Sequence, residues 1–236
     1  MAADTKQRDP RTVKLKGVRL SFADSLKDKK KTAKTEDAKL AHCANLILES
    51  TSPNFADNKS KCLAAVQAAC EQEWKNKDKW KELQEENPKA GVAYRKGERF
   101  KNQETGEVYS GYAGNMVIAG KGPSAGQKRP RLLDRGKRRL KDQAKPEDLK
   151  AGIYFEESAI NDIFYGGCYC DAIVSFYGTK KGGDKVCVSI DAIHSHQNGE
   201  RVGGGVEVDD DDFDDFDDEE DLGGGAAASS DDDDIG

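Results

Sequence analysis

GCYCDAIVSFYG (residues 167–178) and KVCVSIDAI (residues 185–193) decide the fold class, because both alternate apolar and polar residues with a period of two. The even positions from Cys168 to Phe176 and from Val186 to Ala192 are small or apolar, whereas the odd positions are mixed. Successive side chains of a strand point to opposite faces, so each segment is predicted to be a strand with one buried face. The residues TKKGGDK (179–185) that join them, with two glycines, predict a hairpin turn.

Further strands are expected upstream. Residues 12–22 alternate in the same way, with Phe22 at the end of the apolar series, and a phase slip at Gly17 indicates a bulge or bend. Two more strand segments and one hairpin region follow the same reasoning: residues 40–50, residues 112–120, and the hairpin region 96–112.

One strong helix is expected at residues 58–77. Its apolar residues recur at helical spacing, with lysines and acids on the opposite side: Leu63, Val66, Cys70 and Trp74. A polar continuation ends where Asn87 precedes Pro88. We assign Trp74 and Trp80 to the packing of this helix rather than to a binding site.

Several strands with short turns and one inserted helix predict a mostly β (α+β) fold, a small five-stranded barrel of the oligonucleotide/oligosaccharide-binding (OB) type. Residues 1–202 are expected to form this domain. Residues 203–236 are expected to form a disordered acidic tail, because a densely charged segment with few apolar residues cannot offset its chain entropy by burial.

Charge is divided unevenly along the 236 residues. The net charge is −6, but the residues from Glu207 onward hold sixteen acids and no Lys or Arg, which leaves 28 acids against 38 bases in the body, a net of +10. A basic body with an acidic tail favours polyanion binding. The sequence predicts no membrane span and no signal peptide, and six cysteines without an export signal fit reduced thiols in a cytoplasm.

A basic stretch lies between the predicted strands. Crowding its cations costs self-repulsion that a chain of phosphates would relieve with counterion release. The alternative is a solvated surface loop. The candidate phosphate contacts are Lys128, Arg129, Arg131, Arg135, Lys137, Arg138 and Arg139.

Aromatic residues are the second part of the predicted site, because bases stack on flat rings whatever their sequence. Tyr169 and Tyr177 fall on the mixed face of their strand. A second group combines rings with cations: Phe100, Tyr109 and Tyr112 with Arg95, Arg99 and Lys101. For any one of these rings, packing in the core is the alternative.

The sequence shows little sign of a metal site or a catalytic site. The C-x-C of Cys168 and Cys170 places both thiols on the apolar face, at the wrong spacing for a zinc knuckle. No phosphate-loop motif and no nucleophile–histidine pair occurs at motif spacing. We therefore expect no enzyme, no metal and no cofactor.

The segment from Tyr165 to Gly204 resembles the C-terminal part of the OB-fold single-stranded-DNA-binding proteins of tailed phages. The resemblance is carried by a Y-x-G-C-Y strand at residues 165–169, an S-[IL]-x-A-I strand at 189–193 and a G-E-R-x-G-G segment at 199–204. It spans about residues 11–206. The tip DDDDIG resembles the acidic tip of bacterial homologues but lacks their terminal Phe.

The combined reading is a non-enzymatic protein that coats single-stranded DNA without base readout during phage replication, recombination and repair. The resemblance implies that the acidic tail regulates access to DNA and docks DNA polymerase, primase-helicase or recombination proteins, and it leaves a homodimer open. The tail anchors would be Phe213, Phe216, Leu222 and Ile235. The alternative is an acidic-tailed chaperone or scaffold that binds basic proteins through an OB-like adaptor, and a nuclease is a more distant one.

Overall fold

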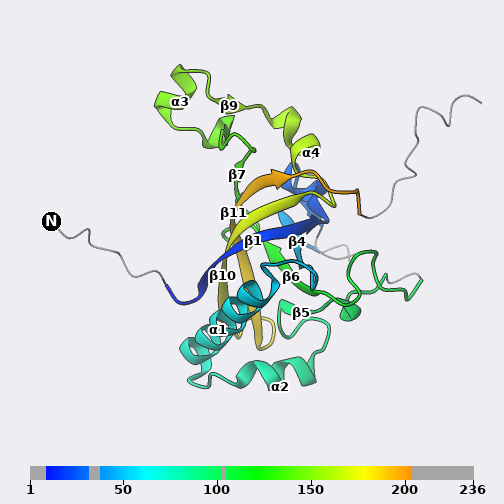
Figure 1. Ribbon diagram of the computed structural model, residues 1–236. Coiled ribbons are helices and arrows are strands. Elements are labelled where there is room, and N and C mark those ends of the chain that lie inside the picture. The colour runs from blue at the N-terminus through cyan, green and yellow to red at the C-terminus, as the bar shows by residue number, and fades with distance from the viewer. Residues whose placement is uncertain (1–8, 32–37, 103–104, 203–236) are drawn as a thin grey trace, which may run out of the picture. The chain divides into compact units, whose positions relative to one another are not determined.

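Five strands close into a ring at the centre of the fold (Figure 1). They are β1 (Thr12–Ser21), β4 (Cys43–Leu48), β6 (Met116–Lys121), β10 (Tyr169–Thr179) and β11 (Lys185–Gln197). β1 pairs antiparallel with β10 and β4, β4 with β6, and β10 with β11. The parallel pairing of Lys121 with Ser189 joins β6 to β11 and completes the ring. The mostly β fold with this ring confirms the predicted fold class.

The computed structural model describes residues 9–31, 38–102 and 105–202, so the predicted tail lies outside the described residues. Within these ranges, no helix is both long enough and apolar enough to span a bilayer. The smaller elements inserted between ring strands are η1 (Ala23–Leu26), β2 (Lys30–Lys31), β3 (Leu40–Ala41) and β5 (Tyr94–Lys96).

The predicted bulge in β1 is confirmed. The register against β10 shifts between Leu15 and Val18, and Gly17 has a φ of 57°, which a residue without a Cβ adopts at little cost. The shift keeps both Leu15 and Val18 in the core. The prediction for Phe22 was wrong: its side chain is 49% exposed, because the chain leaves the strand at Phe22 with a left-handed φ of 51°.

The inserted helix α1 (Phe55–Trp74) confirms the predicted helix and packs on β10. Its buried stripe runs through Cys62, Val66 and Cys70, while Leu63, which the spacing placed in the core, is 37% exposed. Close packing requires Gly178 in β10, since a Cβ there would lie 2.7 Å from the Trp74 ring. The polar continuation forms a separate helix, α2 (Lys79–Glu86).

The basic stretch is not a loop, as its glycine and proline had suggested. It contains β7 (Arg131–Leu133) and β8 (Arg139–Leu140), and it is followed by α3 (Pro146–Lys150), β9 (Tyr154–Phe155) and α4 (Ile160–Ile163). β7 pairs in parallel with Ala192–His194, the second half of β11. That half extends beyond the ring and offers an open edge, which a reading of local sequence cannot reveal. β8 and β9 continue the sheet outward.

The expected hairpin region between β5 and β6 is only partly regular. Among the described residues there, an isolated bridge joins Lys101 to Val108. Both thiols of the C-x-C segment, Cys168 and Cys170, point into the core, as their parity predicts. Burial raises the pKa of the Cys168 thiol to about 11, which removes it as a ready metal ligand or nucleophile.

Candidate nucleic-acid interface

One row of side chains crosses five strands on the outer face, the side of β10, β1, β4, β6 and β5 that points away from the ring interior. The strand registers place these residues opposite one another in sequence: Tyr169 with Arg19, Arg19 with Ile47, Ile47 with Val117, and Val117 with Arg95. One end of the row therefore holds Tyr169 and Arg19, and the other end holds Arg95. The two residues between them are apolar. Ile47 and Val117 in the middle are fully buried, so the accessible parts of the row are its two ends. An aromatic ring and cations at those ends suit bases and phosphates.

Tyr169 is held at one end of this row by polar contacts. Its hydroxyl donates a hydrogen bond to Glu49 Oε2 at 3.0 Å, and the Arg19 guanidinium lies 5.8 Å from the centre of its ring. Arg19 also forms an ion pair with Glu49 at 3.3 Å. Partial burial and the hydrogen bond to Glu49 raise the pKa of Tyr169. The ring is fixed in orientation, half-buried and on the predicted face.

The second predicted group forms an aromatic cluster at the other end of the row. Tyr112 is 1% exposed, and its hydroxyl donates to Ser21 Oγ at 3.1 Å and accepts from Asn45 Nδ2 at 2.9 Å. Phe100 is 8% exposed and lies in the same cluster. Both rings pack against Ile47 and Val117 and so cover the middle of the row, while Tyr109 is only half-buried.

The cations of this group differ in accessibility. The Arg95 guanidinium stacks over Phe100 at 4.0 Å, and Arg95 Nη1 donates to the carbonyl of Val92. Burial, with a smaller effect from Arg99, lowers the pKa of Arg95 to about 10. Arg95 is half-buried, and a partly desolvated cation attracts an incoming anion more strongly than a fully hydrated one. Arg99 is half-buried and Lys101 is exposed.

Tyr177 lies on the same face of β10 as Tyr169 but at its opposite end. Eight residues of extended strand separate them by roughly 26 Å. Tyr177 pairs with Cys187 in the register of β10 and β11, and burial raises its pKa. The two tyrosines therefore do not form one site, although a strand of several nucleotides could pass both.

The structure divides the basic stretch by role. Arg129 is a brace: it pairs with Asp142 and Glu157, its guanidinium donates to the carbonyl of Lys27 at 2.6 Å, and its side chain is only 13% exposed. Lys128 and Arg131 are exposed. Phosphate contacts are thus open to Lys128 and Arg131, whereas Arg129 is occupied in joining three segments.

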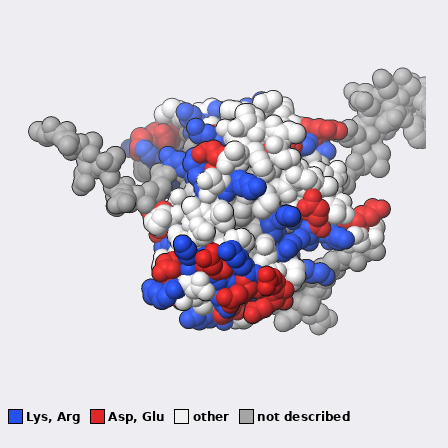
Figure 2. Space-filling model, turned by 60° about the horizontal axis from the view of Figure 1, so that its bottom comes forward, with Lys and Arg blue, Asp and Glu red and all other residues white. Residues whose placement is uncertain are grey.

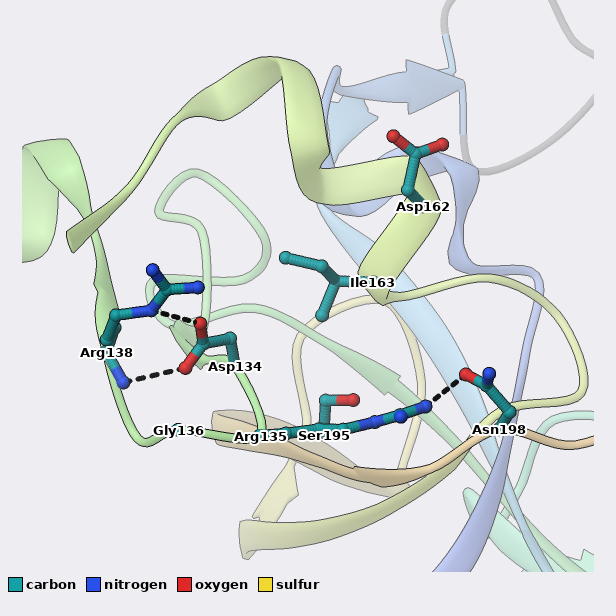
Figure 3. Close-up of a pocket in the computed structure, with 8 residues that line it drawn as sticks. All are labelled: Asp134, Arg135, Gly136, Arg138, Asp162, Ile163, Ser195 and Asn198. Atoms are coloured by element: carbon teal, nitrogen blue, oxygen red, sulfur yellow. Dashed lines mark hydrogen bonds and ion pairs between the residues drawn. The ribbon is translucent and has the colours of Figure 1, made fainter.

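The turn between β7 and β8 presents Arg135 and Arg138 at a small pocket of about 350 Å³ (Figure 3). Arg138 is oriented by the nearly buried Asp134, which accepts from its backbone N–H at 2.8 Å and from its Nε at 2.7 Å. Arg135 donates to Asn198. Lys137 is exposed at the tip and Arg139 is half-buried in β8. Asp162 and Ile163 of α4 and Ser195 of β11 complete the pocket lining.

Other charged surfaces look different. Figure 2 brings the face around α1 and α2 forward, and there lysines and arginines are interspersed with acids. Ion pairs such as Lys61 with Asp57 and Lys79 with Glu82 account for part of this mixture. A mixed surface of this kind is the ordinary solvated face of a helix and does not attract a polyanion.

Sequence reasoning missed Arg19 and the lysines that follow η1. Arg19 has the parity of the outer face in an alternating strand, so the period of two could have identified it. Three exposed lysines of that segment, Lys29, Lys30 and Lys31, lie near the basic stretch, because Lys29 donates to Gln127 at 3.3 Å. Only the fold brings these two segments together.

The segment Asn198–Val202, here called the strap, crosses the end of the ring and leads to the tail. Arg19 Nη2 donates to the carbonyl of Glu200 at 2.6 Å, Tyr165 donates to the carbonyl of Gly199 at 2.9 Å, and the N–H of Val202 donates to Gly166. The strap therefore meets both the outer face, through Arg19, and the pocket, through Asn198.

Solved structures of known proteins share the fold of this chain. A structure entitled single-stranded DNA-binding protein from bacteriophage Enc34 in complex with ssDNA shares 13% identity, covers 85% of this chain and all of its own, and has a TM-score of 0.55. A second structure, entitled single-stranded DNA-binding protein from bacteriophage Enc34, also shares 13% identity. It covers 88% of this chain and 95% of its own, and it has a TM-score of 0.56. At this identity the structures show a shared fold.

No curated protein sequence matches the chain. The family model described as Enterobacter phage Enc34, ssDNA-binding protein, matches residues 11–223, nearly the full length. The chain therefore belongs to the family of phage single-stranded-DNA-binding proteins named for that of Enterobacter phage Enc34.

Proposed function

We propose that this protein coats single-stranded DNA, without reading its sequence, during phage DNA replication, recombination and repair. The observation that carries the proposal is the cross-strand row from Tyr169 to Arg95, in which five strands bring one aromatic ring and two cations onto one face. Membership of the phage family supports it. Stacking and phosphate contacts tolerate any base, so the binding is independent of sequence.

The cations beyond the row extend this surface. Lys128, Arg131, Arg135 and Lys137 are exposed and would contact phosphates that leave the outer face. The acidic tail would compete with DNA for these cations and would dock replication or recombination proteins once DNA displaces it. Its charge supports this role: sixteen acids follow a body of net charge +10.

The test is a titration of the tail-less body, residues 1–203, with fluorescent oligo-dT and with a duplex of equal length. We expect tight binding to oligo-dT at low salt, weaker binding to the duplex, and an affinity that falls steeply as salt rises. A body that ignores oligo-dT but binds basic proteins would favour an adaptor function, and magnesium-dependent cleavage of the oligonucleotide would reveal a nuclease.

Tyr169→Ala should weaken oligo-dT binding by roughly 1–3 kcal/mol, because a stacking ring is lost. The slope of log affinity against log salt should barely change, since no phosphate contact is removed. Tyr169→Phe keeps the ring and is expected to bind like the wild type. Tyr177→Ala applies the same measurement to the far end of β10; a variant that melts earlier yet binds normally would assign that ring to packing.

A further inference from the structure

Phe22 has an exposed side chain and a strained backbone, neither of which helps the chain to fold. Its side chain is 49% exposed, whereas the smaller Ala23 and Ser25 beside it are 2% and 3% exposed. Its φ of 51° lies in the left-handed region, which is unfavourable for a bulky side chain. Exposure of an apolar ring and backbone strain both oppose folding, and strained residues of this kind cluster at functional sites.

The surroundings of Phe22 hold its ring in one place on the outer face. It follows Ser21, whose hydroxyl accepts the Tyr112 hydrogen bond. Its ring centre lies 5.0 Å from that of Tyr109, with the planes at 79°, and 6.4 Å from that of Tyr112 at 76°. Perpendicular contacts are a favoured arrangement of aromatic pairs and hold the ring in place, while about half of the residue stays exposed.

The position of Phe22 also suits a bound strand. Ser21 pairs with Asn45 in the register of β1 and β4, two residues beyond the pair of Arg19 with Ile47. Phe22 thus stands at the edge of the row, where β1 leads into the lysines Lys29 and Lys30. An exposed ring beside two tyrosines, followed in the chain by exposed lysines, suits a site at which a base stacks while its phosphates meet cations.

We infer that Phe22, held in perpendicular contact with Tyr109, is a platform on which a nucleobase of the bound strand stacks. The ligand class is an unpaired base of any identity, because a flat ring offers no hydrogen-bonding groups. This inference rests on the proposed function and adds to it a residue outside the groups that the sequence indicated. The strained backbone directs the ring outward and is the structural cost of that exposure.

Because the backbone at Phe22 is strained, removing the ring should lower the affinity for DNA without lowering the melting temperature. Phe22→Gly and Phe22→Asn both remove the ring, and both residues adopt the left-handed backbone more readily than Phe. We expect the affinity for oligo-dT to fall about 5- to 150-fold, with an unchanged salt slope. The melting temperature should equal or exceed that of the wild type. Phe22→Trp retains a flat ring and should bind within about threefold of the wild type.

An oligonucleotide with abasic positions isolates the stacking contribution. Wild-type protein should lose affinity when bases are removed, whereas Phe22→Gly should lose less, because one of its stacking contacts is already gone. Leu63→Ala is the matched control: it removes another exposed apolar side chain, on α1, and should leave binding unchanged.

The outcomes separate the two proposals. If wild-type protein fails to bind oligo-dT, the proposed function is wrong. If the wild type binds and Phe22→Gly and Phe22→Asn bind equally well, only the platform is wrong. If Phe22→Gly and Phe22→Asn both melt well below the wild type, Phe22 is a packing residue, and this result would also overturn the inference.

Discussion

Replacing Arg131, Arg135 and Lys137 with alanine is expected to weaken oligo-dT binding by about two to three orders of magnitude at 50 mM salt. Each phosphate contact contributes about 0.7 to the log–log salt slope for single strands, so three contacts account for about 2. Extrapolated from 1 M salt, where the electrostatic contribution vanishes, a slope of 2 gives a loss of this size. The slope itself should flatten by about 2.

The choice of residues follows from their contacts. All three side chains are exposed, whereas Arg129 braces other segments and Arg138 is paired with the nearly buried Asp134. Removing either of those would disturb folding as well as binding. Affinity should be measured by fluorescence anisotropy at several salt concentrations.

A variant with Lys59, Lys61 and Lys77 replaced by alanine is the charge-matched control, because it removes three exposed cations from α1 and the turn after it. It should keep nearly the wild-type slope. Equal effects of the two triple variants would mean that net charge alone, rather than the β7–β8 turn, governs binding.

Truncation after Gly203 should tighten binding to single-stranded DNA, most strongly at low salt. The truncation removes all sixteen acids that follow the basic body. If the tethered acids occupy the cationic surface nine-tenths of the time, the apparent affinity of the full chain is lowered about tenfold. Rising salt screens these exposed contacts, so the advantage of the truncated chain should shrink.

Paired titrations of full-length and truncated protein at two salt concentrations measure this effect. The melting temperature should not change, and binding to replication or recombination partners should be lost, because Phe213, Phe216, Leu222 and Ile235 are removed as well. A chain with the acids replaced by Ser and Gln, at constant length, is the control for the bulk of the tail. Equal affinities at low salt would restrict the tail to solubility or partner docking.

The fold could be predicted from the sequence because its signals are local. The alternation of apolar and polar residues in β1, β10 and β11 predicts which face of each strand is buried, and the phase slip at Gly17 predicts the bulge. β7 and β8 escaped prediction because their pairing depends on an edge of β11 that is distant in sequence. Short strands have too few residues to show a period.

The candidate site was predictable only in its composition. Aromatic and basic residues could be found in the sequence, but their accessibility depends on tertiary packing. Tyr112 and Arg129 are taken up by internal contacts, while Phe22 points outward although the period of β1 placed it inside. The left-handed backbone at Phe22 is a local departure that no hydrophobic pattern encodes.

β11 gives the interface a property that its individual residues lack. Its first half completes the ring through Ser189, and its second half carries β7 through Ala192–His194. The outer face and the cationic turn are therefore joined through one strand, and we expect them to open together when that strand melts. Because the interface is preorganised in this way, the protein loses little conformational entropy on binding. The entropy that is lost is then chiefly that of the DNA strand.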